Sequence, residues 1–219
     1  MRTKTTLLAL AGTGAVAGAA YLWFGDRAPY PYSQRWMLDL PLPGLTTARL
    51  ARVLDPRPGE RMLEIGPGTG LHTMAMADRL GPAGRLDVLD IQQEMLDHVD
   101  RRARHLGTIV PNLGDARELP FDSGTFDAIY MVTVLGEIGN TTTVLREAAR
   151  ALKPGGRLVI GEFFDPHWIP LGRLRDHAAA AHLHIDDRIG PTTAYLARLR
   201  PCSHGTCATE SYHHDRGRR

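Results

Sequence analysis

The chain has 219 residues, which is enough for one domain of ordinary size but short for two. Hydrophobic residues make up 43% and charged residues 23%, the balance of a folded globular protein rather than a disordered one. The formal net charge of +2 gives no indication of a nucleic-acid partner.

The N-terminal segment, residues 1–25, is the least typical of a globular domain. Arg2 and Lys4 precede an uncharged stretch, residues 5–25, that is rich in Ala, Gly and Leu and ends near three aromatic residues. Such a stretch is about long enough to cross a hydrocarbon core of ~30 Å as a helix, and aromatic residues are typical of a membrane interface. We predict a membrane anchor. A cleaved signal peptide and a loosely packed soluble helix are the alternatives.

Two further boundaries follow from composition. Residues 26–44 form a connector rich in proline and aromatic residues, and its prolines exclude a regular helix across its ends. Residues 45–201 are expected to form the main domain, and residues 202–219 a disordered polar tail. The tail holds both cysteines, too few for a disulfide framework or a zinc site, although nearby histidines leave a weak metal-binding tail as the alternative.

Strands and helices alternate through most of the main domain. A short amphipathic helix is predicted first, at 46–54. Strands are then predicted at 61–65, 85–90, 108–112, 126–133 and 157–162, and helices at 69–80, 93–106 and 141–152. This alternation predicts a parallel sheet that is covered by helices on both faces. A helix at 170–183 precedes two alternating segments, 184–189 and 193–199, which predict a terminal antiparallel pair.

A glycine-rich turn follows the first strand. The sequence Glu64-Ile65-Gly66-Pro67-Gly68-Thr69-Gly70 ends that strand and opens a helix. Glycine allows tight turns and close approach of a ligand, and helix N-termini favour electron-rich partners. The third glycine comes one residue early for the dinucleotide pattern G-x-G-x-x-G. By itself the turn is ambiguous, because any flexible turn would show the same residues.

Polar residues at the ends of the next strands strengthen the case for a ligand. Asp90 ends the second strand, where a carboxylate can accept hydrogen bonds from ribose hydroxyls; capping of the following helix is the alternative. Asp115 follows the third strand and could receive an adenine amino group, or could be a plain turn aspartate. The fourth strand ends near Thr133, where a sheet of this kind presents an acceptor pocket.

These motifs stand in order together with Gly114-Asp115-Ala116-Arg117-Glu118-Leu119-Pro120-Phe121, Phe126-Asp127-Ala128-Ile129-Tyr130 and Lys153-Pro154-Gly155-Gly156. In this order they resemble class I S-adenosylmethionine-dependent methyltransferases, and within them the UbiE/COQ5-like and methyltransferase-11-type branch. The resemblance covers about residues 45 to 200. It implies a Rossmann-like, doubly wound α/β fold with a mostly parallel seven-stranded sheet and a C-terminal antiparallel hairpin.

The resemblance also implies a cofactor, S-adenosyl-L-methionine, and residues that hold it. Glu64 and the three glycines would line its methionine part, Asp90 would hold the ribose, Ile91 and Asp115 with Ala116 would contact the adenine, and Thr133 would lie beside the sulfonium. The full set of implied cofactor-binding residues is Glu64, Gly66, Pro67, Gly68, Thr69, Gly70, Asp90, Ile91, Asp115, Ala116 and Thr133. Glu64 could instead only brace the glycine loop.

The residues leave the acceptor and the catalytic group open. Methyl transfer requires mainly that donor and acceptor are held in line, and a base is needed only if the acceptor must lose a proton. Glu137, His72 and His167 are candidate bases, each with a plain pocket or surface role as the alternative. The predicted anchor, the aromatic connector and the segment 163–168 suggest a small lipophilic acceptor, of quinone or phospholipid type.

Location and activity each have alternatives. The cofactor is made in the cytosol, and arginines after the hydrophobic segment outnumber the basic residues before it, so the domain is expected to face the cytoplasm. Without the anchor, the protein would be cytoplasmic. A non-catalytic cofactor-binding protein of the same fold and, with less support, a nicotinamide-dependent oxidoreductase are the competing functions. The early third glycine and the Lys153–Gly156 turn argue against the oxidoreductase.

Overall fold

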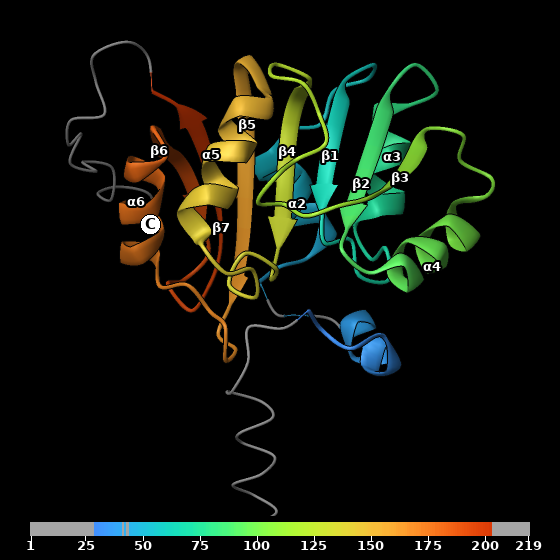
Figure 1. Cartoon of the computed structure of the whole chain (residues 1–219), viewed down its shortest axis with the longest axis horizontal. Coiled ribbons are helices and arrows are strands. Elements are labelled where there is room, and N and C mark those ends of the chain that lie inside the picture. The colour runs from blue at the N-terminus through green and yellow to red at the C-terminus, as the bar shows by residue number, and fades with distance from the viewer. Residues whose placement is uncertain (1–28, 41, 43, 203–219) are drawn as a thin grey trace, which may run out of the picture.

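The structure is a computed structural model that describes residues 29–40, 42 and 44–202 (Figure 1). The predicted membrane anchor and all of the predicted tail except Cys202 lie outside the described residues. Within the described part of the chain, none of the helices is both long enough and apolar enough to cross a membrane.

Seven strands form one sheet in the order β3-β2-β1-β4-β5-β7-β6. The strands are β1 Arg61–Ile65, β2 Arg85–Asp90, β3 Ile109–Leu113, β4 Phe126–Val132, β5 Leu152–Phe163, β6 Leu183–Ile189 and β7 Ala194–Pro201. The first five are parallel to one another, whereas β7 runs antiparallel to both β5 and β6. This arrangement confirms the predicted mostly parallel sheet with a terminal antiparallel hairpin.

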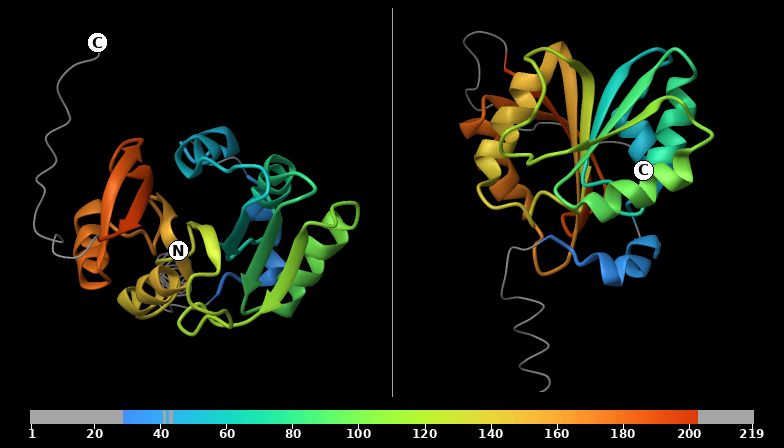
Figure 2. Two further views of the ribbon diagram at one scale, coloured as in Figure 1. Left: turned by 90° about the horizontal axis from the view of Figure 1, so that it is seen from above. Right: turned by 45° about the vertical axis from the view of Figure 1, so that its right-hand side comes forward.

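Helices cover both faces of the sheet, as Figure 2 shows from two further directions. The helices are η1 Tyr32–Asp39, a 3-10 helix, and α2 Thr47–Leu54, α3 Thr73–Leu80, α4 Gln93–Ala103, α5 Thr141–Ala151 and α6 Leu171–Ala180. Side chains of α2, α3 and α4 join one apolar core, and those of α5 and α6 join the other. Successive strand residues alternate between the two cores: Met62 belongs to the first and Leu63 to the second.

Several predicted boundaries were wrong by one to five residues, among them the end of the helix predicted at 93–106, which stops at Ala103, and the three that follow. The helix expected from residue 69 begins at Thr73, because the glycine loop continues through a turn at residues 69–72. The helix expected to reach residue 183 ends at Ala180, and Leu183 already belongs to β6. The Lys153–Gly156 turn is part of β5, where the pairing with β4 is irregular between Phe126 and Ala128.

The strand order reverses between β1 and β4. β1 leads through α3 to β2 on one side, whereas β4 pairs with the opposite edge of β1. The loops beyond the carboxyl ends of these two strands therefore diverge and leave a crevice. In Figure 1 this end of the sheet faces downward, and η1 lies below it.

Candidate cofactor pocket

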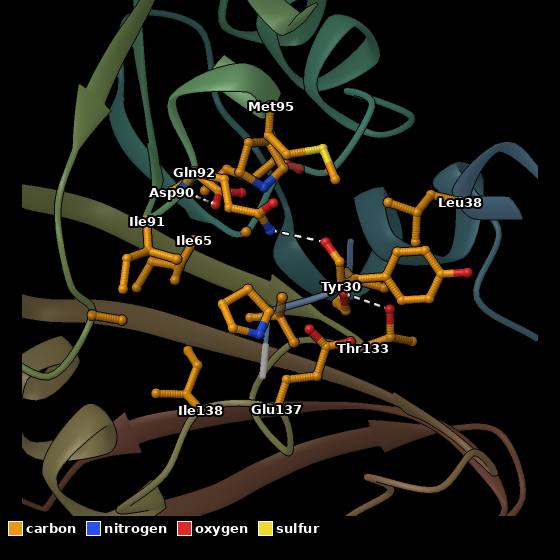
Figure 3. A pocket seen from close by; sticks show the side chains of 18 of the residues that line it. Tyr30, Leu38, Ile65, Asp90, Ile91, Gln92, Met95, Thr133, Glu137 and Ile138 are labelled. Atoms are coloured by element: carbon orange, nitrogen blue, oxygen red, sulfur yellow. Dashed lines mark hydrogen bonds between the residues drawn. The ribbon is translucent and has the colours of Figure 1, made fainter. Parts of the chain in front are cut away.

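A pocket of about 540 Å³ lies beyond the carboxyl ends of the parallel strands (Figure 3). This volume is within the range of small-molecule sites. The structure brings ten of the eleven predicted cofactor-binding residues to its wall: Glu64, Gly66, Pro67, Gly68, Thr69, Asp90, Ile91, Asp115, Ala116 and Thr133. The eleventh, Gly70, is buried away from the pocket wall, where a Cβ would lie 3.2 Å from the Met74 side chain.

The glycine loop has a backbone that side chains would prevent. Gly66, Gly68 and Gly70 have φ values of +67°, +54° and +84°, in the left-handed region that favours glycine. A Cβ on Gly66 would lie 2.3 Å from a methyl carbon of Val134, which is closer than two non-bonded carbon atoms can approach. The loop after β1 therefore lies directly against the loop after β4, and glycine is required for that approach.

Glu64 is buried beneath the loop, with 4% of its surface exposed. Its Oε2 accepts a hydrogen bond of 2.5 Å from Thr73 Oγ1 at the start of α3. Burial raises the pKa of Glu64 to about 7, although the hydroxyls of Thr73 and Tyr130 oppose the shift. Glu64 therefore braces the junction between β1 and α3, and it also lines the pocket.

The carboxylate of Asp90 lies at the next strand end. Its Oδ1 accepts a 2.9 Å hydrogen bond from the backbone N–H of Gln92, and burial raises its pKa. Gln92 is the N-cap residue of α4, so Asp90 contacts the start of this helix through the backbone N–H of the N-cap residue, and it also lines the pocket. The Gln92 side chain in turn donates a 2.9 Å hydrogen bond to the carbonyl oxygen of Tyr30.

Asp115 also lines the pocket, but it has a strong internal partner. Its two carboxylate oxygens form a bidentate pair with the Arg117 guanidinium, with Nη2 2.5 Å from Oδ2. Its Oδ1 additionally accepts from the backbone N–H of Arg117 at 2.8 Å. Arg117 therefore lowers the pKa of Asp115. A ligand amino group at this position would have to share the carboxylate with Arg117.

Thr133 directly follows β4 and has an unusual backbone conformation. Its φ of +57° is rare for a β-branched residue, and its backbone N–H donates to the carbonyl oxygen of Gly161 at 2.8 Å. Its hydroxyl donates to the carbonyl oxygen of Val132 at 2.8 Å. Such strain persists only where the surroundings hold it, and it is common at functional sites.

A lid segment, residues 29–40, covers the pocket, although the sequence indicated only a connector there. Pro29, Tyr30, Met37, Leu38 and Leu40 line the pocket, yet no residue of η1 is buried. Polar contacts hold this segment to the domain. Thr69 Oγ1 donates to Asp39 Oδ1 at 2.6 Å, and the Arg102 guanidinium lies 3.7 Å from the same oxygen.

Two of the three candidate bases line the pocket. Glu137 lies on the segment after β4, and burial together with the neighbouring Asp165 raises its pKa to about 7. His72 lines the pocket too, but its Nδ1 lies 2.9 Å from Thr47 Oγ1, and burial lowers its pKa to about 4. His167 is not among the lining residues.

Several lining residues have no clear signal in the sequence. Gln92 follows Asp90 by two residues, but nothing in a single sequence indicates that its side chain reaches the lid segment. Asp165 lies within the aromatic segment 163–168, and only the fold places it beside Glu137. The sequence signal that could have found the lid segment is its density of aromatic and proline residues directly before the first predicted helix.

Comparison with known proteins agrees with this geometry. A family model described as a methyltransferase domain matches residues 62–156. Over 117 residues the chain is 42% identical to an uncharacterized 37.1 kDa protein in transposon TN4556 of Streptomyces fradiae, covering 52% of this chain and 32% of that protein. Over 142 residues it is 34% identical to the ubiquinone/menaquinone biosynthesis C-methyltransferase UbiE of Cronobacter sakazakii, covering 63% and 55%. The chain thus spans about half the length of the latter relative, and less of the former.

Solved structures share the fold. A SAM-dependent methyltransferase from Aquifex aeolicus matches with a TM-score of 0.71 at 17% identity, covering 78% of this chain and 97% of that one. The [4+2]-cyclase SpnF matches with a TM-score of 0.64 at 19% identity, covering 72% and 80%. The fold alone therefore does not define the reaction. Family model, relatives and fold together support a class I S-adenosylmethionine-dependent methyltransferase domain that includes residues 62–156.

Proposed function

We propose that this protein transfers a methyl group from S-adenosylmethionine to a small, lipophilic acceptor. The order of the pocket residues carries the proposal. Asp115 follows β3, Asp90 ends β2, the glycine loop follows β1 and Thr133 follows β4, and these four strands are neighbours in the sheet. An extended ligand with adenine, ribose and an amino acid part would meet these groups in that sequence along the crevice.

The chemical character of the wall suits this cofactor. S-adenosylmethionine supplies a methyl group on a positively charged sulfur, which makes the carbon reactive toward in-line attack. Glu64, Asp90, Glu137 and Asp165 line the pocket, and in residues 29–40, 42 and 44–202 no arginine or lysine forms an ion pair with them. A cationic ligand would meet uncompensated carboxylates there, whereas the pyrophosphate of a nicotinamide cofactor would be repelled.

The contribution of the chain to catalysis would be positioning. Asp90 would orient the ribose, the glycine loop would admit the amino acid part, and the strained Thr133 would present its backbone near the reacting carbon. The lid segment would exclude water, because it spans from Gln92 to Thr69 over the same cavity. Held reactants in a closed site can account for most of the acceleration that this reaction needs.

The acceptor end of the pocket is largely apolar. Leu38, Leu40, Leu42, Ile138 and Phe163 line the wall, and Phe164 lies with 65% of its surface exposed at the edge. These side chains support a quinone-type or phospholipid-type acceptor. The accepting atom, whether O, N or C, follows from none of them.

The N-terminal residues support a membrane location for this chemistry. We propose that residues 1–25 anchor the chain, that residues 26–44 connect it to the domain at 45–201, and that the domain faces the cytoplasm, where the cofactor is made. The basis is the sequence alone: an uncharged stretch at 5–25 followed by several arginines. Protease accessibility of the domain in intact cells tests this arrangement, and cleavage from outside would contradict it.

Calorimetry with the purified protein tests the cofactor. We expect S-adenosylmethionine to bind and NAD not to bind. Replacing Asp90 by Asn should weaken binding by about 10- to 100-fold, the value of a hydrogen bond to a charged group. Asp100→Asn, on the exposed side of α4, is the matched control and should bind as the wild type does. Binding of NAD alone, or equal affinities for both variants, would overturn the assignment.

An acceptor screen then separates enzyme from binding protein. Membrane and soluble extracts are incubated with methyl-labelled cofactor, and label is counted in the lipid and aqueous fractions. Label in lipid products supports the proposal, whereas label in water-soluble products alone rejects a lipophilic acceptor. Cofactor binding with no labelled product in any fraction would favour the non-catalytic binding protein.

A further inference from the structure

Glu137 differs from the other pocket carboxylates in that the N–H group favouring its ionised form belongs to the lid segment. Glu64 accepts from Thr73, Asp90 from Gln92 and Asp115 from Arg117. Glu137 has no ion pair in the described part of the chain. Its ionised form is favoured only by the backbone N–H of Tyr30 in the lid segment. Figure 3 shows its carboxyl group directed into the cavity, toward Tyr30 and Thr133.

The charged groups around Glu137 come from three neighbouring elements and all are acidic. Asp165 follows β5, Asp90 ends β2, and Glu162 lies within β5; each of these carboxylates repels a negative charge on Glu137 or is repelled by it. The Tyr30 hydroxyl in the lid segment donates to Met37 Sδ at 3.0 Å, and burial together with the charge of Glu137 raises the pKa of this phenol. Among the described residues, those whose charge shifts the pKa of Glu137 are all acidic, so a positive charge bound beside it would favour its ionised form.

The fold also places Glu137 at the reacting end of a bound cofactor. Asp90 marks the ribose position at β2, and the glycine loop lies at β1. In the proposed arrangement the sulfur, which links the ribose and the amino acid part, would lie where the crevice opens toward the neighbouring strand end, β4. Glu137 lies four residues beyond Thr133 on the segment that follows β4 and lines the same cavity.

We propose that Glu137 senses the charge on the cofactor sulfur: it ionises when the sulfonium form binds and takes up a proton when the sulfur becomes neutral. The proposal rests on the proposed function. In the reaction the methyl group leaves the sulfur with its bond electrons going to sulfur, an acceptor atom forms the new bond to carbon, and the proton that the acceptor loses passes to the Glu137 carboxylate. Glu137 would thus suit acceptors that lose a proton, such as a hydroxyl or an amine.

Proton release on cofactor binding tests the proposal without any acceptor. S-adenosylmethionine and S-adenosylhomocysteine differ at the sulfur, which is charged in the first and neutral in the second. Calorimetry in buffers of different ionisation enthalpy counts the protons released. Because burial and Asp165 raise the pKa of Glu137 to about 7, at pH 7 we expect the charged ligand to release about half a proton more through Glu137.

Three variants assign that proton. Glu137→Gln keeps the shape of the side chain and an oxygen for the Tyr30 amide, and it should abolish the excess release. Comparing variant with wild type also removes the ligands' own ionisation from the difference. Asp165→Asn should reduce the excess at pH 7, because it removes a negative neighbour that raises the pKa of Glu137. Glu94→Gln, an exposed position on α4, is the matched control and should leave the excess unchanged.

Affinity gives a second readout. On the acid side of the Glu137 pKa, the preference for the charged over the neutral ligand should fall by up to tenfold per pH unit in the wild type, and Glu137→Gln should lose this dependence. Equal proton release for both ligands, or an excess that survives in Glu137→Gln, would overturn the proposal. Failure of S-adenosylmethionine to bind at all would instead overturn the proposed function.

Discussion

Replacing Gly66 by alanine tests how the glycine loop is held against the loop after β4. The added Cβ would lie 2.3 Å from Val134 Cγ2, so Val134 or the backbone must move. The φ of +67° adds a backbone penalty of about 1–2 kcal/mol for a residue with a side chain. Overpacking typically costs about 1–3 kcal/mol more. We expect the free energy of unfolding to fall by about 2–5 kcal/mol.

Gly59 provides the matched control for this experiment. Its φ is +82°, but a Cβ there would meet nothing within 4 Å. Gly59→Ala should therefore cost only the backbone penalty, about 1–2 kcal/mol. The difference between the two alanine variants isolates the steric conflict with Val134. Urea unfolding followed by circular dichroism measures both, provided that the m-values agree.

A double-mutant cycle locates the conflict. Val134→Ala removes the two methyl carbons that the new Cβ would meet, so Gly66→Ala should cost less in that background, by about 1–3 kcal/mol. Equal stabilities of Gly66→Ala and Gly59→Ala would refute a steric conflict at Gly66. An equal cost of Gly66→Ala with valine and with alanine at position 134 would show that Val134 is not the residue in conflict.

Two further predictions concern a buried acid and the lid segment. Glu162 is 2% exposed, and burial raises its pKa to about 8. Because the folded protein binds this proton more tightly than the unfolded chain does, the resulting contribution to the free energy of unfolding is fully present below about pH 4.5 and is lost as pH rises through about 8. Glu162→Gln should therefore reduce the loss of stability between pH 5 and pH 9 by on the order of 4 kcal/mol, measured by urea unfolding; parallel pH profiles for variant and wild type would contradict this. Asp39→Ala removes the hydrogen-bond acceptor of Thr69 and the ion-pair partner of Arg102. Amide hydrogen exchange in residues 32–40 should therefore accelerate, while the global free energy of unfolding changes by less than about 1 kcal/mol. Unchanged exchange would show that Asp39 does not hold the lid segment.

The strands were predictable because local pattern and burial agree there. β1 and β2 begin and end at the predicted residues, since both are short apolar runs between turn residues and both are buried on two faces. The start of α3 was not predictable, because the turn at residues 69–72 is fixed by contacts with the lid segment and Arg102 rather than by its own sequence. The same holds for η1, whose residues form contacts with parts of the chain far away in sequence.

The pocket residues likewise divide into those whose position the sequence predicts and those whose position it does not. The glycine loop, Asp90 and Thr133 follow strand ends, and parallel topology brings strand ends together, so their convergence could be expected. The closeness of Asp165 to Glu137 depends on how the loops after β4 and β5 pack. A Cβ on Gly136 would lie 1.8 Å from the carbonyl oxygen of His167, which shows how tightly these loops meet. No periodicity or spacing in one sequence encodes such a loop contact.

The position of β7 has a consequence for how the chain folds during synthesis. β7 is the last strand of the described chain, yet it lies between β5 and β6 and hydrogen-bonds to both. Until residues 194–201 leave the ribosome, β5 is an open edge whose backbone groups at Val159 and Ile160 have no strand to pair with on that side, and such edges favour aggregation. The nascent chain therefore depends on its last strand to close the sheet, and a chain ended at residue 190 should aggregate where residues 1–202 remain dispersed.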